Sequence, residues 1–163
     1  MKRRVVVTGI GVVTSLGRQV GEVWTRICNG ENGVHPLRTF DASAYRVRFG
    51  GEVSDWSPAG YIEKRDEKKL DRFTQFALVG AVDAVKDSGI DYSREDLFRC
   101  GVMIGSGIGG LTEIETQHQR LLEKGPEKVS AFTIPKLIAN AASGVVSIQW
   151  GLKGPNAAIE PPL

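Results

Sequence analysis

Apolar and polar positions along the chain form blocks that predict strands and helices in alternation. Residues 4–13 begin with β-branched residues and then reach two glycines, which is typical of a buried strand that runs into a crowded turn. Residues 20–28 predict a helix that Asn29 and Gly30 end. The apolar positions that share one face of this helix are Val20, Val23, Trp24, Ile27 and Cys28.

The middle of the chain is polar at first and then strongly helical. Residues 31–60 are rich in Gly, Pro and Asp, and the weak alternation over residues 45–53 predicts a surface excursion with a short hairpin. Charged residues from Ile62 onward predict a short helix. Residues 73–85 predict a longer, buried helix, which Ser88-Gly89 ends.

The last third of the chain predicts two further strands with helices between them. Residues 101–104 form a short apolar run, a glycine-rich loop follows at 105–110, and a helix is expected over residues 111–124. Pro135 is suited to the start of a helix that reaches Trp150, and residues 156–159 predict a third strand. Strands that alternate with helices indicate an α/β layered fold with a mostly parallel sheet.

Composition narrows the class of protein. The 163 residues suit one domain, and a net charge of +2 with 41% hydrophobic and 25% charged residues argues against disorder and against a nucleic-acid-coating protein. No stretch approaches the ~20 apolar residues of a membrane span, and we interpret the N-terminal run as a strand, not as a signal peptide. Cys28 and Cys100 lie far apart without metal-ligand spacing, so we expect two small buried hydrophobes in a reducing, cytoplasmic setting.

The glycine-rich loop GSGIGG at residues 105–110 formally satisfies the dinucleotide motif GxGxxG between a strand and a helix. Such a site also needs an acidic residue about 20 positions further on, at the end of the next strand. Glu127 falls near that distance but lies in a Pro-containing loop with no strand before it. The favoured interpretation is therefore that the glycines let the chain pass close to another packed element.

A cluster of basic residues interleaved with acidic ones occupies residues 63–72. From the spacing alone, a solvated helix face with internal ion pairs is favoured over a docking patch for an acidic protein partner. His35 and His118 are isolated from any Ser, Cys or acidic group that would orient them, so both are expected at the surface or in packing roles. No complete active site can be assembled from these residues alone.

Several segments taken together are far more specific than any one of them. In chain order they are VVVTGIGVVTSLG, EVWTRICNGENGV, KLDRFTQFALVGAVDAVKDSG, GVMIGSGIGGL, GPEKVSAF and WGLKGPNAAI. Their order and separations resemble the β-ketoacyl-[acyl-carrier-protein] synthase II family up to about Ile159, and the isoleucine in GSGIGG favours the elongating type II enzyme. The resemblance implies a thiolase fold of two similar α/β halves, of which residues 1–163 would form a single incomplete N-terminal domain without the nucleophile helix and the second half.

The resemblance implies a decarboxylative Claisen condensation for fatty-acid elongation. In the family an acyl chain moves from the phosphopantetheine arm of acyl carrier protein to a cysteine at the N-terminus of a buried helix, where the helix dipole favours the thiolate. Residues 160–163 depart from the family pattern, and Leu163 stands where that cysteine would fall. We therefore expect no catalytic residue in this chain, no cofactor or metal of its own, and no activity of the chain alone. The alternative is a non-catalytic accessory subunit resembling a polyketide chain-length factor, while a dinucleotide-binding oxidoreductase is a distant third hypothesis.

Non-catalytic roles carry over by position. Ile108 matches the gate of the acyl pocket, and Thr133 and Ile134 match its lining from across a dimer interface. The positions that match carrier-protein docking are Arg65, Lys68, Lys69 and Lys128. The strand that pairs with its copy across the homodimer two-fold would comprise Asn156, Ala157, Ala158 and Ile159. Without the central helix, one sheet face is expected to leave apolar surface uncovered, which favours association.

Overall fold

A computed structural model describes residues 3–159, which fall into two compact units. The first unit contains the residues up to Ser57 together with Gly80–Gly89, and the second contains Pro58–Val79 and the residues from Ile90 onward. No helix among residues 3–159 is long and apolar enough to cross a membrane. The departure expected at residues 160–163 lies outside the described residues.

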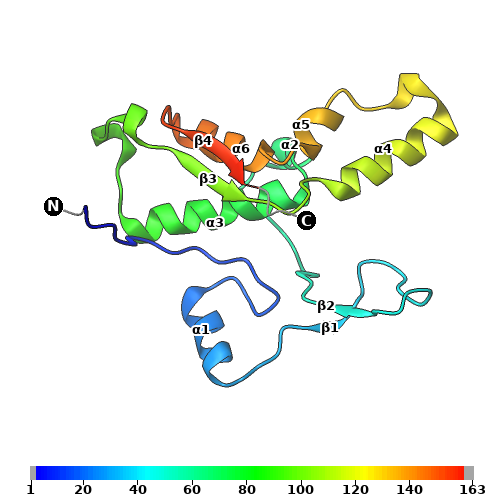
Figure 1. The fold of residues 1–163 in the computed structure, drawn as a ribbon, viewed down its shortest axis with the longest axis horizontal. Helices are drawn as coiled ribbons and strands as arrows, with labels where there is room; N and C mark the ends of the chain where they lie inside the picture. The colour runs from blue at the N-terminus through cyan, green and yellow to red at the C-terminus, as the bar shows by residue number, and fades with distance from the viewer. Residues whose placement is uncertain (1–2, 160–163) are drawn as a thin grey trace. The chain divides into compact units, whose positions relative to one another are not determined.

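Besides the helical residues of Gly80–Gly89, the first unit contains helix α1 and a small antiparallel strand pair (Figure 1). Helix α1 (Val20–Cys28) has the predicted bounds, and Gly30 follows it at a φ of 71°. Strands β1 (His35–Pro36) and β2 (Phe49–Gly50) confirm the predicted hairpin. Glu52 ties the hairpin together, because its carboxylate accepts hydrogen bonds from the backbone N–H groups of Arg38 (2.8 Å) and Thr39 (3.2 Å).

The prediction of a buried strand over residues 4–13 is wrong. This segment pairs with no strand in the described part of the chain, and Val5 and Val7 are 95% and 81% exposed. A strand needs a neighbour to satisfy its backbone N–H and C=O groups, and here the apolar residues lack one. The predicted crowding is nevertheless real, because a Cβ at Gly11 would lie 1.9 Å from the carbonyl oxygen of Gly80.

The second unit holds most of the buried residues. It opens with α2 (Lys64–Glu67) and the first half of α3 (Arg72–Ser88), whose Thr74, Gln75, Leu78 and Val79 are buried. Two short 3₁₀ turns, Tyr92–Arg94 and Leu97–Arg99, lead into β3 (Val102–Gly105). The remaining elements are α4 (Leu111–Lys124), a 3₁₀ turn at Pro126–Lys128, α5 (Thr133–Leu137), α6 (Ala141–Trp150) and β4 (Asn156–Ile159).

Strands β3 and β4 form the predicted parallel pair. The register joins Val102 to Asn156 and Gly105 to Ile159, and α6 packs against both strands (Figure 1). Ser143, fully buried on α6, donates a hydrogen bond to the Asn156 side chain (2.8 Å), and the Asn156 amide donates back to the Ser143 carbonyl (2.8 Å). These reciprocal bonds fix α6 on the start of β4.

The single helix predicted from Pro135 to Trp150 is two helices in the structure. Pro135 lies inside α5, and Ile138 adopts an extended backbone with φ −65° and ψ 140°. The carbonyl of Leu137 accepts a hydrogen bond from the backbone N–H of Gly110 (3.0 Å), so it no longer needs a partner in the next helical turn. A contact with the glycine-rich loop thus replaces the helical hydrogen bond at this break.

Candidate functional site

The glycine-rich loop of residues 105–110 lies directly against α5. Gly109 has a φ of 84°, and a Cβ there would approach the Leu137 carbonyl oxygen to 2.4 Å. A Cβ at Gly110 would lie 2.8 Å from the Lys136 carbonyl oxygen. The hydroxyl of Ser106 accepts a hydrogen bond from the Gly109 N–H (3.0 Å) and closes the turn. These two glycines are therefore explained by close backbone packing, as the favoured sequence interpretation held.

The predicted acyl-pocket residues lie on these two packed segments. Ile108 is on the loop and is 59% exposed, whereas Ile134 is on α5 and is 62% exposed. Thr133 is half-buried and its hydroxyl donates to the Ser130 carbonyl (2.6 Å), so that hydroxyl is occupied within its own turn. The structure thus brings the loop and α5 together and leaves both isoleucines exposed.

A buried polar network between α4 and α5 was missed at the sequence level. Lys136 Nζ lies 2.7 Å from Glu113 Oε2, and the two side chains are only 18% and 7% exposed. Glu113 Oε1 accepts from the Gln117 amide (2.9 Å), and Gln117 Oε1 accepts from the backbone N–H of Ser130 (3.0 Å). The Glu113-to-Gln117 spacing of four places both side chains on one helical face, but nothing in the sequence pointed to Lys136 as their partner.

The basic cluster on α2 is largely paired within itself. Arg65 Nε lies 2.9 Å from Glu63 and 3.4 Å from Asp66, and Lys69 Nζ lies 2.6 Å from Asp66. The hydrogen bond from Lys69 is the main reason that the pKa of Asp66 is lowered. Lys68 is exposed and forms no ion pair with any residue of the described range.

Lys128, the fourth predicted docking residue, closes the 3₁₀ turn after α4. It is likewise exposed and has no ion pair within residues 3–159. Of the four docking candidates, Lys68 and Lys128 therefore carry charges that no described acidic side chain neutralises.

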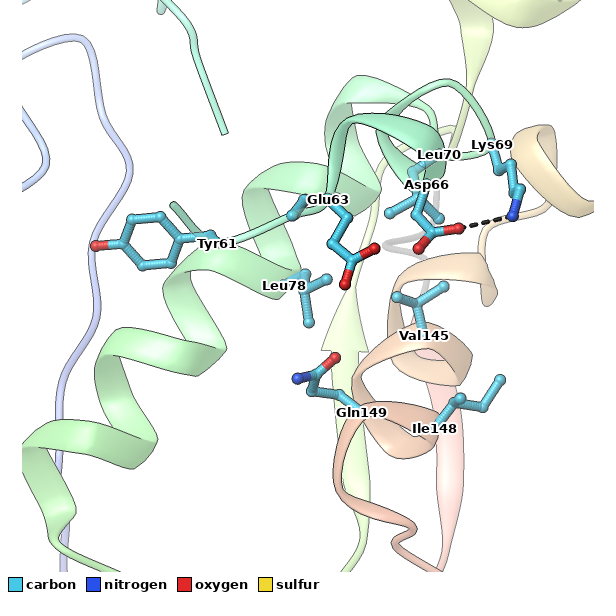
Figure 2. A pocket seen from close by; sticks show the side chains of 10 residues that line it. Tyr61, Glu63, Asp66, Lys69, Leu70, Leu78, Val145, Ile148 and Gln149 are labelled. Atoms are coloured by element: carbon cyan, nitrogen blue, oxygen red, sulfur yellow. Dashed lines mark hydrogen bonds and ion pairs between the residues drawn. The ribbon is translucent and has the colours of Figure 1, made fainter. Parts of the chain in front are cut away.

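A pocket of about 370 Å³ lies beside α2, between α3 and α6 (Figure 2). Its apolar wall comes from Ile62, Leu70, Leu78, Val145 and Ile148, and its polar wall from Tyr61, Glu63, Asp66, Lys69 and Gln149. None of these lining residues is Ser, Thr, Cys or His, and the Asp66 carboxylate is held charged by Lys69. The lining therefore presents no Ser–His or Cys–His pair of the kind that activates a hydroxyl or thiol nucleophile.

The cysteines and histidines are not gathered into a site. His35 and His118 are exposed, as one of the sequence interpretations expected. Cys100 is half-buried, but Cys28 is exposed, so the prediction of a buried hydrophobe is wrong there. Cys28 is the last residue of α1, and the face on which it lies is mostly exposed, with Trp24 66% and Ile27 52% exposed.

Solved structures define the class of protein. The chain superposes on a ketosynthase/chain length factor named for ishigamide with a TM-score of 0.82 and 26% identity, covering 98% of this chain and 40% of that one. It superposes on a ketosynthase in complex with its type II PKS acyl-carrier protein with a TM-score of 0.76 and 25% identity, covering 93% of this chain and 40% of that one. A β-ketoacyl synthase from Burkholderia phymatum, 22% identical with a TM-score of 0.73 over 97% of this chain and 39% of its own, shows the same fold. The chain thus has a partial, thiolase-like ketosynthase fold of the α/β class.

Sequence comparison identifies the family. The sequence model described as "Beta-ketoacyl synthase, N-terminal domain" matches residues 2–160, and the chain belongs to that family. It is 46% identical to 3-oxoacyl-[acyl-carrier-protein] synthase 2 of Coxiella burnetii, covering 97% of this chain and 38% of that relative. The protein of the same name from Vibrio harveyi is 44% identical, covering 97% of this chain and 38% of that relative. The one from Staphylococcus aureus is 42% identical, covering 96% of this chain and 38% of that relative. The chain spans less than two-fifths of the length of these curated relatives.

Proposed function

We propose that this chain supplies the N-terminal part of a 3-oxoacyl-[acyl-carrier-protein] synthase, which elongates fatty acids by decarboxylative Claisen condensation. The observation that carries the proposal is the 42–46% identity to synthases of that name over nearly the whole chain. In this reaction an enzyme cysteine first takes the acyl group from acyl carrier protein. Malonyl carrier protein then loses CO₂, and its carbanion attacks the thioester to form the new carbon–carbon bond.

The chain by itself is proposed to be inactive, because neither of its cysteines suits the role of nucleophile. A reactive thiolate is favoured at a helix N-terminus, where the dipole stabilises negative charge. Cys28 ends α1, where the dipole opposes a thiolate, and Cys100 lies in the turn before β3. Incubation of the purified chain with acyl and malonyl carrier proteins should give no condensation product, and robust product formation would refute this part of the proposal.

The acyl pocket is proposed to include Ile108, Thr133 and Ile134. As the resemblance implies, Thr133 and Ile134 would line it from across the dimer interface, and the exposure of both isoleucines supports this assignment. We propose further that the chain needs no cofactor of its own, since the phosphopantetheine arrives on the carrier protein. The proposed setting is the cytoplasm, where fatty-acid elongation with a soluble carrier protein would take place.

Docking of acyl carrier protein is proposed to use Arg65, Lys68, Lys69 and Lys128. Because Arg65 and Lys69 already have acidic partners, Lys68 and Lys128 should contribute most to the encounter. The replacement Lys68→Glu should slow carrier association by about tenfold at low salt, with a smaller effect at high salt. Surface plasmon resonance with immobilised acyl carrier protein measures this rate.

Lys64→Glu is the matched control for this experiment. Lys64 is the first residue of α2, which ends just before Lys68, and it is likewise exposed but outside the docking set. If Lys64→Glu and Lys68→Glu slow association equally, α2 attracts the carrier only through its general charge, and the residue assignment is wrong.

Homodimerisation is proposed to use Asn156, Ala157, Ala158 and Ile159. Strand β4 pairs with β3 on one edge, and no described strand covers the other edge. An open edge can pair with its own copy across a two-fold axis. Half-buried Ala157 and Ala158 would allow such close approach.

A second candidate is a non-catalytic accessory subunit resembling a chain-length factor. The superposition on a solved structure described as a ketosynthase/chain length factor, at a TM-score of 0.82, supports this candidate. Such a subunit would pair with a partner that carries the cysteine. Co-purification of this chain with a cysteine-bearing ketosynthase from its own host, in a one-to-one complex, would favour the accessory subunit over the condensing enzyme.

A further inference from the structure

The buried ion pair between Glu113 and Lys136 occupies a position that simple stability does not explain. Its side chains are almost wholly removed from water, at 7% and 18% exposure, with an N–O separation of 2.7 Å. Removing two charges from water costs several kcal/mol per ion, and apolar residues of the same volume often give a more stable protein. The ion pair is therefore best explained by the arrangement of α4 and α5 that it specifies.

The pair belongs to a small network of hydrogen-bonded side chains. Glu113 Oε2 binds Lys136 and Oε1 accepts from Gln117, while the other end of the Gln117 amide accepts from the Ser130 N–H. Both carboxylate oxygens therefore have protein partners. Glu113 thus connects Lys136 of α5 to Gln117 of α4, and Gln117 in turn binds the backbone before α5, an arrangement that indicates a positional role.

The ion pair and a backbone hydrogen bond of the glycine-rich loop both connect the start of α4 to α5. On the backbone, Gly110 N–H donates to the Leu137 carbonyl at 3.0 Å, and Glu113 lies in the first turn of α4, directly after that loop. Between side chains, Lys136, which precedes Leu137, donates a hydrogen bond to the Glu113 carboxylate. Helix α5 has only five residues, too few to be stable without tertiary contacts. These two bonds are among the tertiary contacts that place it.

We propose that Glu113 and Lys136 form a clamp that holds α5 against the glycine-rich loop and thereby fixes Ile134 relative to Ile108. The clamp makes Glu113 and Lys136 positioning residues. On the proposed function, on which this consequence rests, Ile108 gates the acyl pocket of its own protomer, whereas Ile134 lines the pocket of the dimer partner. The clamp then affects acyl-chain selectivity by fixing the position of both residues relative to the dimer.

Hydrogen exchange of the chain itself tests the clamp without reference to acyl binding. The variant E113Q/K136M removes both charges, keeps similar volumes and leaves no buried ion unpaired. Exchange of the amides of residues 133–138 should rise at least about tenfold, whereas the amides of β3 and β4 should change less than about twofold. Unchanged protection of residues 133–138 would overturn the proposal.

Glu115→Gln is the matched control, because Glu115 lies on the same helix but is exposed. It should leave the exchange of α5 as in the unmodified chain. The single variant Glu113→Gln, which leaves Lys136 buried without its partner, should raise α5 exchange further than the double variant does. Equal effects of Glu115→Gln and Glu113→Gln would also overturn the clamp, since any charge on α4 would then suffice.

Acyl selectivity tests the consequence that rests on the proposed function. The ratio of dissociation constants for medium-chain and long-chain acyl-pantetheine should change at least about fivefold in E113Q/K136M and stay constant in Glu115→Gln. A constant ratio, with α5 released in the exchange experiment, would overturn the selectivity role. If no form of the chain binds acyl-pantetheine, the proposed pocket fails, while hydrogen exchange still decides on the clamp.

Discussion

At the scale of single residues, Gly109 is required for a reason that its sequence motif does not indicate. The string GSGIGG suggests a phosphate-binding turn, yet Gly109 is required because its φ is positive and the α5 backbone lies where a side chain would begin. Gly107, in the same string, has open space around it. The structure therefore requires glycine at position 109 but leaves room for a side chain at position 107, a difference that the motif alone does not show.

The replacement Gly109→Ala should destabilise the chain by about 1–3 kcal/mol. The added Cβ would lie 2.4 Å from the Leu137 carbonyl oxygen, in a backbone region unfavourable to alanine, so α5 would have to shift. Urea unfolding followed by circular dichroism measures the loss. Gly107→Ala is the control and should change the stability by less than about 0.5 kcal/mol. Equal losses in both variants would contradict the argument.

At the scale of secondary-structure elements, tertiary contacts decided where helices end. The glycine after α1 and the Ser88-Gly89 end of α3 are local signals, and the structure confirms both. The break between α5 and α6 has no such signal, because it follows from the hydrogen bond that Gly110 gives to Leu137. Local propensity predicts a helix end well only when the cause of that end is local.

The hairpin of β1 and β2 should lose its order in acid. Hydrogen bonds from the Thr39 hydroxyl and the backbone of Arg38 lower the pKa of Glu52 below its ordinary value of 4.5. A lowered folded pKa stabilises the hairpin above pH 4.5, and this contribution is lost as the pH falls through the lowered value. The protection of the Arg38 and Thr39 amides, measured by NMR as exchange relative to the intrinsic rate, should therefore fall as the pH drops below 4.5 and through the lowered pKa of Glu52.

The variant Glu52→Gln isolates the cause of this acid sensitivity. It retains one acceptor oxygen but cannot titrate, so the exchange of Arg38 and Thr39 should vary with pH only as the intrinsic exchange rate does. If the variant shows the same acid step as the unmodified chain, a group other than Glu52 is responsible.

At the scale of the whole molecule, the chain exposes apolar residues that its own described elements do not cover. Val5, Val6 and Val7 are 95%, 64% and 81% exposed in an extended segment, and Met103 of β3 is 66% exposed. Exposed β-branched segments with free backbone groups are templates for pairing with other chains. The association that the sequence led us to expect therefore remains a prediction, and these exposed residues are the ones expected to mediate it.

The purified chain should associate at about 10 μM and above. The variant Val7→Lys should reduce association because a charge blocks edge pairing, whereas Thr8→Lys, at a polar exposed position, should reduce it less. Analytical ultracentrifugation measures the mass distribution. A monodisperse monomer for the unmodified chain would contradict the argument.

The sequence by itself determined the family, the order of the elements and the bounds of most helices. It could do so because hydrophobic periodicity, caps and glycines act over a few residues, and because a long run of ordered motifs is specific. Only the tertiary structure showed that residues 4–13 pair with no strand within residues 3–159, that α5 and α6 are separate, and that Glu113 binds Lys136. Each of these depends on which distant segments come into contact, and short-range patterns carry no information about such contacts.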